Sequence, residues 1–377
     1  MRIPFNRPSI VGNEMRYIAE AVAGGQLSGN GEFTRRCCRW LEAQAGGKAV
    51  LTHSCTGALE MAALLLDLGP GDEVIMPSFT FVSTANAFAL RGAVPVFVDI
   101  RPDTLNLDER LVEAAVTPRC KAIVPVHYAG VGCEMEALLA IAARHRLAVV
   151  EDAAHALGAR YRGRPLGTLG HLGCYSFHET KNIISGEGGA LMVMEPGLAE
   201  RAEIVSEKGT NRQRFDRGQV DKYAWVELGS SYLPSELVAA FLYAQFEEAD
   251  AIHARRLHLW QRYRDALAPL AESGRLRLPH VPSHCEHNAH MFYILIENEA
   301  TRAALIAHLR QAGILAVFHY VPLHTSPMGR KLLAGQPPSL PVTEAIAGRL
   351  LRLPMYGALS FDDVDRIVDA IHAFFGR

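Results

Sequence analysis

Short apolar runs that alternate with helical segments are the feature that most restricts the fold of this chain. From residue 48 to about 195, each of the first runs is followed by a segment whose apolar residues recur at helical spacing. Strands separated by helices of roughly 10–15 residues indicate crossover connections and a mostly parallel sheet, which is an α/β fold. The predicted strands lie in residues 49–52, 72–77, 94–100, 121–127, 147–155, 172–178 and 188–194.

A long helical stretch at about 235–272 is followed by a second, shorter alternation of apolar runs and helical segments. We therefore predict a large domain over residues 31–265 and a smaller C-terminal α/β domain over 266–377, with the boundary near 260–275. Residues 1–30 do not fit the large repeat and are expected to pack beside the smaller domain. The second alternation comprises apolar runs at 291–297 and 315–321, a helix at 301–313 and a closing helix at 361–375.

Charge and cysteine content exclude several classes of protein. The formal net charge of −2 provides no basic surface for nucleic acid and no attraction to an anionic membrane. The first residues lack an apolar signal-peptide core, and no uncharged run reaches the roughly 18 residues that cross a bilayer. Seven scattered cysteines fit a reducing compartment better than a disulfide framework, so we expect a cytoplasmic protein.

Hydroxyl-bearing residues follow the first predicted strand, in the segment HSCTGALEM. Ser54, Thr56 and Gly57 lie where this strand gives way to a helix, and a helix start offers unpaired N–H groups and positive charge. Such a site would hold a phosphate group. The structural alternative is simple capping of the helix by Ser54 or Thr56.

A carboxylate and two aromatic rings lie at the ends of other predicted strands. Asp152 ends an apolar strand, so its carboxylate should be partly buried and needs a partner, either a cationic ring nitrogen or a helix cap or ion pair. Phe79 and Phe81 follow the strand at 72–77, where one ring could lie over a planar cofactor, although most such rings belong to the core.

Lys181 lies in SFHETKN, just before a glycine-rich segment. A lysine with a lowered pKa can form a Schiff base with an aldehyde, whereas the structural alternative is a solvated loop lysine. A phosphate cradle, an aromatic plate, a carboxylate and a lysine together match the needs of pyridoxal 5'-phosphate (PLP). Four weak indications that agree in kind favour a PLP enzyme over each structural alternative.

The segment HCEHNAH suggests a metal site, but its spacing argues against one. It contains His284, Cys285, His287 and His290 in an expected loop, without a C-x2-C pair or an H-E-x-x-H helix. We therefore predict no metal ion.

The chain resembles the DegT-type nucleotide-sugar aminotransferases, a branch of the fold-type I PLP enzymes. The resemblance runs from IPFNRPSIVGNE to the final helix and follows the order HSCTGALEM, PGDEVIMPSFTFVSTANA, VVEDAAHALGA, GCYSFHETKN, GEGGA and VFHYVPLH. It implies that Lys181 bonds the cofactor aldehyde, that Asp152 pairs with the ring nitrogen and that His155 lies near the ring hydroxyl. The ring-stacking aromatic aligns with Phe81, with Phe79 as the alternative.

The resemblance also implies the phosphate site and the substrate pocket. The expected phosphate-binding residues are Ser54, Thr56, Gly57 and Ser176. Many relatives add an Asn across a dimer interface, but here GSSYLPSE places Ser231 there, so the contact is expected to be weaker, water-bridged or made by Ser230. In HYVPLH, His319, Tyr320 and His324 match a motif near the nucleotide sugar.

The resemblance implies a homodimer that transfers nitrogen from an amino-acid donor, expected to be glutamate, to a nucleotide sugar. SFHETKN, EKGTNRQRFDRGQVDKY and NAHMFYI favour dTDP-4-dehydro-6-deoxyglucose as the substrate and surface polysaccharide biosynthesis as the role. UDP-linked and 3-keto sugars remain alternatives, as do small aldehydes and free amino acids. A sugar dehydratase on this scaffold would carry histidine in place of Lys181, and a regulatory PLP-fold protein would need a DNA-binding module or basic surface.

Overall fold

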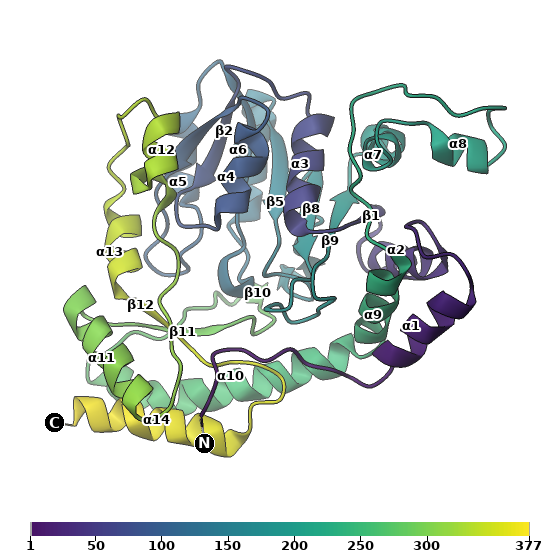
Figure 1. Cartoon of the computed structure of the whole chain (residues 1–377). Coiled ribbons are helices and arrows are strands. Elements are labelled where there is room, and N and C mark those ends of the chain that lie inside the picture. The colour runs from purple at the N-terminus through teal and green to yellow at the C-terminus, as the bar shows by residue number, and fades with distance from the viewer. Residues whose placement is uncertain (1, 377) are drawn as a thin grey trace.

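A seven-stranded sheet forms the centre of the larger part of the molecule (Figure 1). The computed structural model describes residues 2–376. The strands are β1 (Lys48–Thr52), β2 (Glu73–Pro77), β3 (Val94–Val98), β4 (Cys120–Ile123), β5 (Ala148–Asp152), β8 (Leu172–Ser176) and β9 (Gly189–Val193). Their order is β1-β9-β8-β5-β4-β2-β3, and only β9 runs antiparallel to its neighbours. The predicted α/β class and mostly parallel sheet are confirmed.

Both faces of this sheet are buried. Successive side chains along a strand point to opposite sides, so each strand contributes to two apolar layers. Ile75 and Val149 belong to one apolar layer, whereas Met76 and Val150 belong to the other. The first layer packs against α1 (Glu14–Ala23), α2 (Glu32–Ala45), α5 (Glu109–Val112), α6 (Met135–His145) and α9 (Glu236–Glu247). The second packs against α3 (Cys55–Leu65), α4 (Val82–Ala89) and α7 (Ala199–Ser206).

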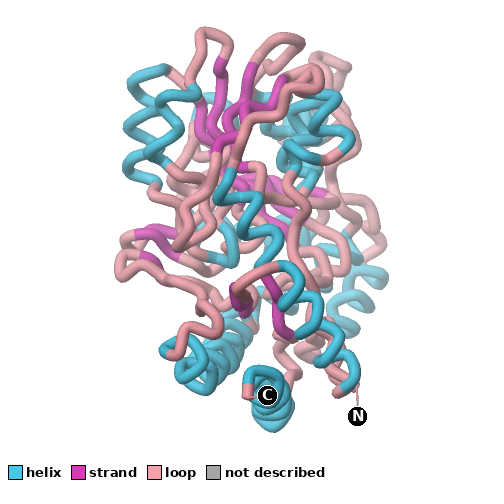
Figure 2. Tube along the Cα trace, turned by 90° about the vertical axis from the view of Figure 1, so that its left-hand side faces the viewer, coloured by secondary structure: helices cyan, strands magenta, loops and turns pink. Residues whose placement is uncertain are grey.

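A second apolar core surrounds a small antiparallel sheet, which lies below the large sheet in Figure 1. This sheet consists of β11 (Phe292–Leu295) and β12 (Leu350–Leu353). It is covered by α10 (Ala249–Glu272), α11 (Glu299–Gln311) and α14 (Phe361–Phe375), and the chain ends lie near these helices (Figure 2). Ile3 joins this core through a bridge to Ile314.

The remaining elements are short. A three-stranded sheet contains β10 (Cys285–Glu286), β6 (Arg160–Tyr161) and β7 (Arg164–Pro165). The other helices are α8 (Arg212–Asp216), α12 (Pro327–Leu332) and α13 (Pro341–Arg349), and the 3-10 turns are η1 (Glu113–Ala115), η2 (Tyr128–Gly130), η3 (Pro196–Leu198) and η4 (Leu323–Thr325). No helix within residues 2–376 is long and apolar enough to cross a bilayer.

The structure differs from the sequence prediction in two elements. The helical stretch predicted at 235–272 is divided at Glu248, whose φ of −105° and ψ of 13° depart from helical geometry, so α9 and α10 are separate helices. The run at 315–321 is not a strand, because only Val317 forms a bridge, with Arg352, and the residues after it line a pocket. The division at 265/266 falls inside α10 and stays a prediction.

Candidate active site

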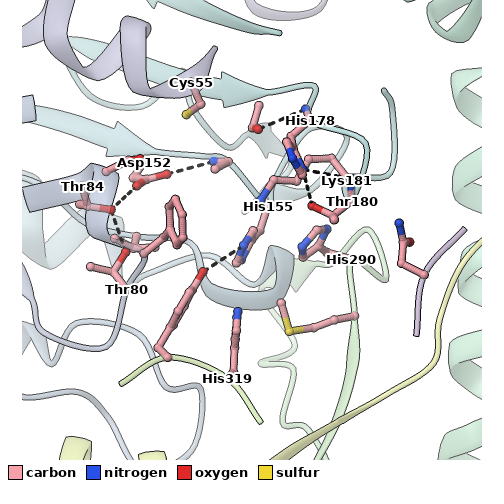
Figure 3. Close-up of a pocket in the computed structure, with 18 of the residues that line it drawn as sticks. Cys55, Thr80, Thr84, Asp152, His155, His178, Thr180, Lys181, His290 and His319 are labelled. Atoms are coloured by element: carbon pink, nitrogen blue, oxygen red, sulfur yellow. Dashed lines mark hydrogen bonds between the residues drawn. The ribbon is translucent and has the colours of Figure 1, made fainter. Parts of the chain in front are cut away.

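One large cavity, of about 740 Å³, lies at the carboxyl ends of β5 and β8, between the large sheet and the small one (Figure 3). Its walls include the N-terminal ends of α3 and α4, as expected for a parallel sheet, and residues of β12. Nine of the twelve predicted site residues line this cavity: Ser54, Thr56, Phe81, Asp152, His155, Ser176, Lys181, His319 and Tyr320.

Lys181 lies in the loop that joins β8 to β9. Backbone hydrogen bonds from Glu179 to Gly186 and from Lys181 to His178 hold this loop. No hydrogen bond or ion pair within residues 2–376 occupies the Lys181 amine. Burial lowers the pKa of Lys181, against the opposing effects of Cys55 and Asp152. The lysine therefore offers a more readily deprotonated amine inside the cavity.

Asp152 is held at the end of β5 by two donors. The hydroxyl of Thr84 donates to its Oδ2 at 2.6 Å, and the N–H of Ala154 donates to Oδ1 at 3.2 Å. The Thr80 hydroxyl lies 2.8 Å from that of Thr84 and extends the network (Figure 3). Because each carboxylate oxygen accepts more than one hydrogen bond, Asp152 can still accept a proton donor from the cavity.

Two helix N-termini meet at the other side of the cavity. The Ser54 hydroxyl caps α3 by accepting from the Gly57 N–H at 3.1 Å, and the Thr56 hydroxyl lies 2.7 Å from that of Ser83 on α4. The N–H groups of Cys55 and Thr56 have no backbone partner among the described residues. This end of the cavity therefore suits an anion such as a phosphate.

Gly57 does not line the cavity, and its N–H is bound by the Ser54 cap. A Cβ at this position would lie 3.0 Å from the His53 ring and 3.2 Å from Tyr232, so the glycine allows close packing of α3. The two interpretations of this segment, capping and phosphate binding, are compatible, since Ser54 caps one N–H and leaves two others free.

Stacked aromatic rings form a third wall. His155 and His290 stack with ring centroids 4.2 Å apart, and His319 stacks on Tyr320 at 3.6 Å. The Tyr128 hydroxyl lies 2.7 Å from His319 Nδ1. Burial lowers the pKa values of His155, His290 and His319, so these imidazoles are neutral near pH 7.

The structure also separates the two candidate phenylalanines. Phe81 lines the cavity with its side chain 58% exposed, whereas Phe79 is 1% exposed and packs against Tyr128 and Tyr320. Only Phe81 is available to cover a ligand placed in the cavity.

Two further predicted residues lie away from the cavity. His324 is buried, with its Nδ1 2.7 Å from the Ser78 hydroxyl and its Nε2 3.2 Å from Glu344. Ser231 is exposed and forms a bridge with Glu207, and its neighbour Ser230 is also exposed. Any contact of either serine with a second subunit stays a prediction.

The four residues of the metal-like segment have separate partners. His284 Nε2 lies 3.1 Å from Glu134, the thiol of Cys285 donates to the Gly132 carbonyl and His287 packs on Trp260. His290 stacks on His155, and its Nδ1 lies 3.1 Å from the side-chain oxygen of Asn182. Within residues 2–376, no group of three or more His, Cys, Asp or Glu side chains could hold a metal ion.

Several cavity residues were missed by the sequence analysis, namely Phe5, Asn6, Ser83, Thr84, His290 and Arg352. His290 was considered only as a metal ligand. Arg352 interrupts an otherwise apolar run, LLRL, and a charged residue in a buried strand is the signal that could have identified it. Phe5 and Asn6 reach the cavity only through tertiary packing, for which the sequence carries no local indication.

The donor groups of the cavity fit PLP. Lys181 offers an unpaired amine for the aldehyde, Asp152 offers a carboxylate for the ring nitrogen and the start of α3 offers N–H groups for the phosphate.

The chain is similar to known proteins along nearly its whole length. The model of the DegT/DnrJ/EryC1/StrS aminotransferase family matches residues 8–372. The chain is 35% identical to the spore coat polysaccharide biosynthesis protein SpsC of Bacillus subtilis, over 98% of this chain and 96% of SpsC. It is 30% identical to the aminotransferase TlmJ of Streptoalloteichus hindustanus, with a TM-score of 0.91 over 99% of both chains.

A third relative was solved with the cofactor. Spr1654 of Streptococcus pneumoniae, assigned as a sugar aminotransferase, is 27% identical over 99% of this chain and 98% of its own. The TM-scores are 0.91 for its PMP form and 0.90 for its PLP form. The chain therefore belongs to the DegT/DnrJ/EryC1/StrS aminotransferase family and is a PLP-dependent sugar aminotransferase.

Proposed function

We propose that the protein aminates C4 of dTDP-4-dehydro-6-deoxyglucose, with glutamate as the nitrogen donor, and forms dTDP-4-amino-4,6-dideoxygalactose. The observation that carries the proposal is the unpaired, buried Lys181 amine in the same cavity as the Asp152 carboxylate. The similarity to SpsC, a spore coat polysaccharide biosynthesis protein, supports a role in surface polysaccharide synthesis.

In this proposal, each residue of the cavity has its own chemical role. PLP, when bound, supplies an aldehyde that carries the amino group and a ring that withdraws electrons from the reacting carbon. The Lys181 Nζ would hold the cofactor aldehyde and would move a proton to or from the reacting carbon. Asp152 would place its carboxylate against the ring nitrogen and favour the protonated form of that nitrogen, and the Thr84 hydroxyl fixes the orientation of the carboxylate.

Other residues position the cofactor and the substrate. Ser54, Thr56 and Ser176 would bind the phosphate, and Phe81 would cover one face of the ring. His155 accepts the N–H of Ala129 at Nδ1, at 3.3 Å, so its Nε2 carries the proton and can donate to the ring hydroxyl. His319 and Tyr320 would contact the nucleotide sugar, and His324 would support them from behind.

Two other substrates share this chemistry, a UDP-linked sugar and a 3-keto sugar. Purified protein should be incubated with PLP, glutamate and a panel of dTDP- and UDP-linked ketosugars, and the product identified by mass and proton NMR. A product from the dTDP-linked 4-ketosugar supports the proposal. A product only from another ketosugar replaces the substrate and retains the reaction.

The same preparation tests the role of Lys181. Wild-type protein should absorb visible light and lose this band with glutamate, whereas Lys181→Ala should have no turnover. Borohydride reduction followed by digestion should place the pyridoxyl group on the peptide that contains Lys181. A tag on another peptide would overturn the assignment.

We also propose a cytoplasmic homodimer with shared active sites, in which the exposed segment at Ser230 and Ser231 approaches the second subunit. Light scattering tests the oligomeric state, and a fully active monomer would contradict it.

A further inference from the structure

Arg352 is a cation of the active-site cavity that has no carboxylate partner within residues 2–376. It lies on β12, where its backbone pairs with that of Val317. Its Nε is buried without a hydrogen-bond partner, and the one hydrogen bond of its guanidinium reaches the Phe318 carbonyl at 3.5 Å. The Phe5 ring lies 4.7 Å from the guanidinium carbon. Most of the five N–H donors of this side chain are therefore unused.

Two arginines that are more deeply buried, Arg256 and Arg302, are held by protein groups. Arg256 donates to three backbone carbonyls, including that of His290 at 2.6 Å. Arg302 also has a buried Nε without a partner, but it binds the Ala347 carbonyl and the Glu299 carboxylate. Both arginines are neutralised or solvated by the protein itself. Arg352 is only partly buried and has no such set of protein partners, so an anion bound in the cavity would supply its counter-ion.

Neither of the two carboxylates that line the cavity forms an ion pair with Arg352. Asp152 accepts from Thr84 and Ala154, and Glu187 lies 3.7 Å from His178. The remaining cation of the cavity is the Lys181 amine, and the charge of Arg352 contributes to lowering the pKa of Lys181. The guanidinium and the Lys181 amine therefore line the same cavity.

This placement discriminates between the anions of the two substrates. In an α-amino acid the carboxylate is bonded directly to the carbon that carries the reacting nitrogen. In a nucleotide sugar with a keto group at C4, the diphosphate is attached at C1, across the sugar ring from the reacting carbon. The cofactor phosphate has its own site at the N-termini of α3 and α4. A cation that lines the same cavity as Lys181 and Asp152 therefore suits the donor carboxylate.

The N-terminal segment helps to hold this cation. The Phe5 ring packs on the guanidinium, and the side-chain amide of the next residue, Asn6, donates to the Glu179 carbonyl in the loop of Lys181 at 3.3 Å. Residues 5 and 6 thus connect the arginine on β12 with the loop that carries the lysine. An aromatic ring on one face leaves the edge of the guanidinium, with its N–H groups, for a planar carboxylate.

We infer that Arg352 is the binding site for the α-carboxylate of the amino donor, held through a paired, charge-assisted hydrogen bond. The inference rests on the proposed transamination and assigns a residue to its first substrate. It also explains why a cation stands in an apolar strand.

Binding of an unreactive carboxylate tests the inference without turnover. Glutarate should be titrated calorimetrically into PLP-loaded wild-type protein and into Arg352→Met and Arg352→Lys. We expect Arg352→Met to weaken glutarate binding about 10- to 100-fold. Arg352→Lys should weaken it less, because lysine keeps the charge but lacks the paired N–H donors of the guanidinium. Arg310→Met, which removes an exposed arginine of α11, should bind glutarate as wild type does.

The two half-reactions give an independent readout. Loss of the visible band with glutamate should need much more glutamate in Arg352→Met, whereas titration of dTDP should give the wild-type affinity. Circular dichroism and thermal unfolding show whether each variant is folded, and Arg352→Lys serves as the test if Arg352→Met is not.

Unchanged glutarate binding in folded Arg352→Met or Arg352→Lys, or a loss of dTDP binding in place of glutarate binding, would overturn the inference. Failure of the proposed function would give a different result. Wild-type protein would then form no aminated sugar from any ketosugar, while the glutarate affinities of wild type and Arg352→Met would still differ.

Discussion

Lowering the pH should destabilise the protein through His253, and the size of the effect follows from its surroundings. This histidine lies on α10, its Nε2 is buried without a hydrogen-bond partner, and its ring fills the space beside Gly158, where a Cβ would lie 2.2 Å from Cε1. Burial, followed by the charge of Arg256, lowers the pKa of His253 from 6.5 to about 4.

Between these two pKa values, the unfolded chain binds a proton at His253 and the folded chain does not. The contribution of His253 to stability is fully present above pH 6.5 and is lost progressively as the pH falls from 6.5 towards 4. Each pH unit in this window costs about 1.4 kcal/mol, so a change from pH 7.5 to pH 5 should cost about 2 kcal/mol at this site.

Comparison of wild type with His253→Gln isolates this term from the other buried histidines. Urea unfolding of both proteins at pH 7.5 and pH 5, followed by tryptophan fluorescence, should show a pH-dependent loss that is about 2 kcal/mol smaller in the variant. His258→Gln, at an exposed position of the same helix, should keep the wild-type profile. Parallel pH profiles of wild type and His253→Gln would refute the argument.

Two further perturbations test a hydrogen bond of the active site and a buried carboxylate of the fold. Thr84→Val should lower kcat about tenfold or more, because it removes the 2.6 Å hydrogen bond that orients Asp152. Thr84→Ser keeps the hydroxyl and should retain most of the activity. Equal losses of kcat in the two variants would show that the hydroxyl does not act through Asp152. Glu236→Ala should lower the free energy of unfolding by about 3 kcal/mol or more, because Glu236 accepts the N–H groups of Gly31, Phe33 and Thr34 at the start of α2. Urea unfolding would measure this loss against the exposed control Glu32→Ala, and equal losses would argue against the role of the buried carboxylate.

The sheet was predictable because its strands carry a local signal. Five of the seven strands lie within a predicted apolar run, and β1 and β4 begin one residue before theirs, since strands buried on both faces are mostly apolar. The division of the helix at Glu248 had no such signal, because both sides continue in helical composition. β12 was missed for the opposite reason, since Arg352 breaks its apolar pattern.

The site was predictable where residues follow strands directly. Asp152 and Ser54 come at strand ends, and the ends of parallel strands meet at one edge of a sheet, so both could be placed near one ligand. The contributions of Phe5 and His290 depend on packing between distant segments. His290 reaches the site because it stacks on His155 and bonds Asn182, and neither partner is near it in sequence.

The hairpin that carries Lys181 has a consequence for anyone who redesigns this scaffold. β8 and β9 pair residue by residue, from Leu172 with Val193 to Ser176 with Gly189, and the loop between them is closed by its own backbone bonds. Inserting or deleting one residue in that loop either displaces Lys181 or shifts the register of β9, so that each of its side chains moves to the opposite face of the sheet. Specificity libraries should therefore randomise side chains at constant hairpin length and reserve length variation for other walls of the cavity.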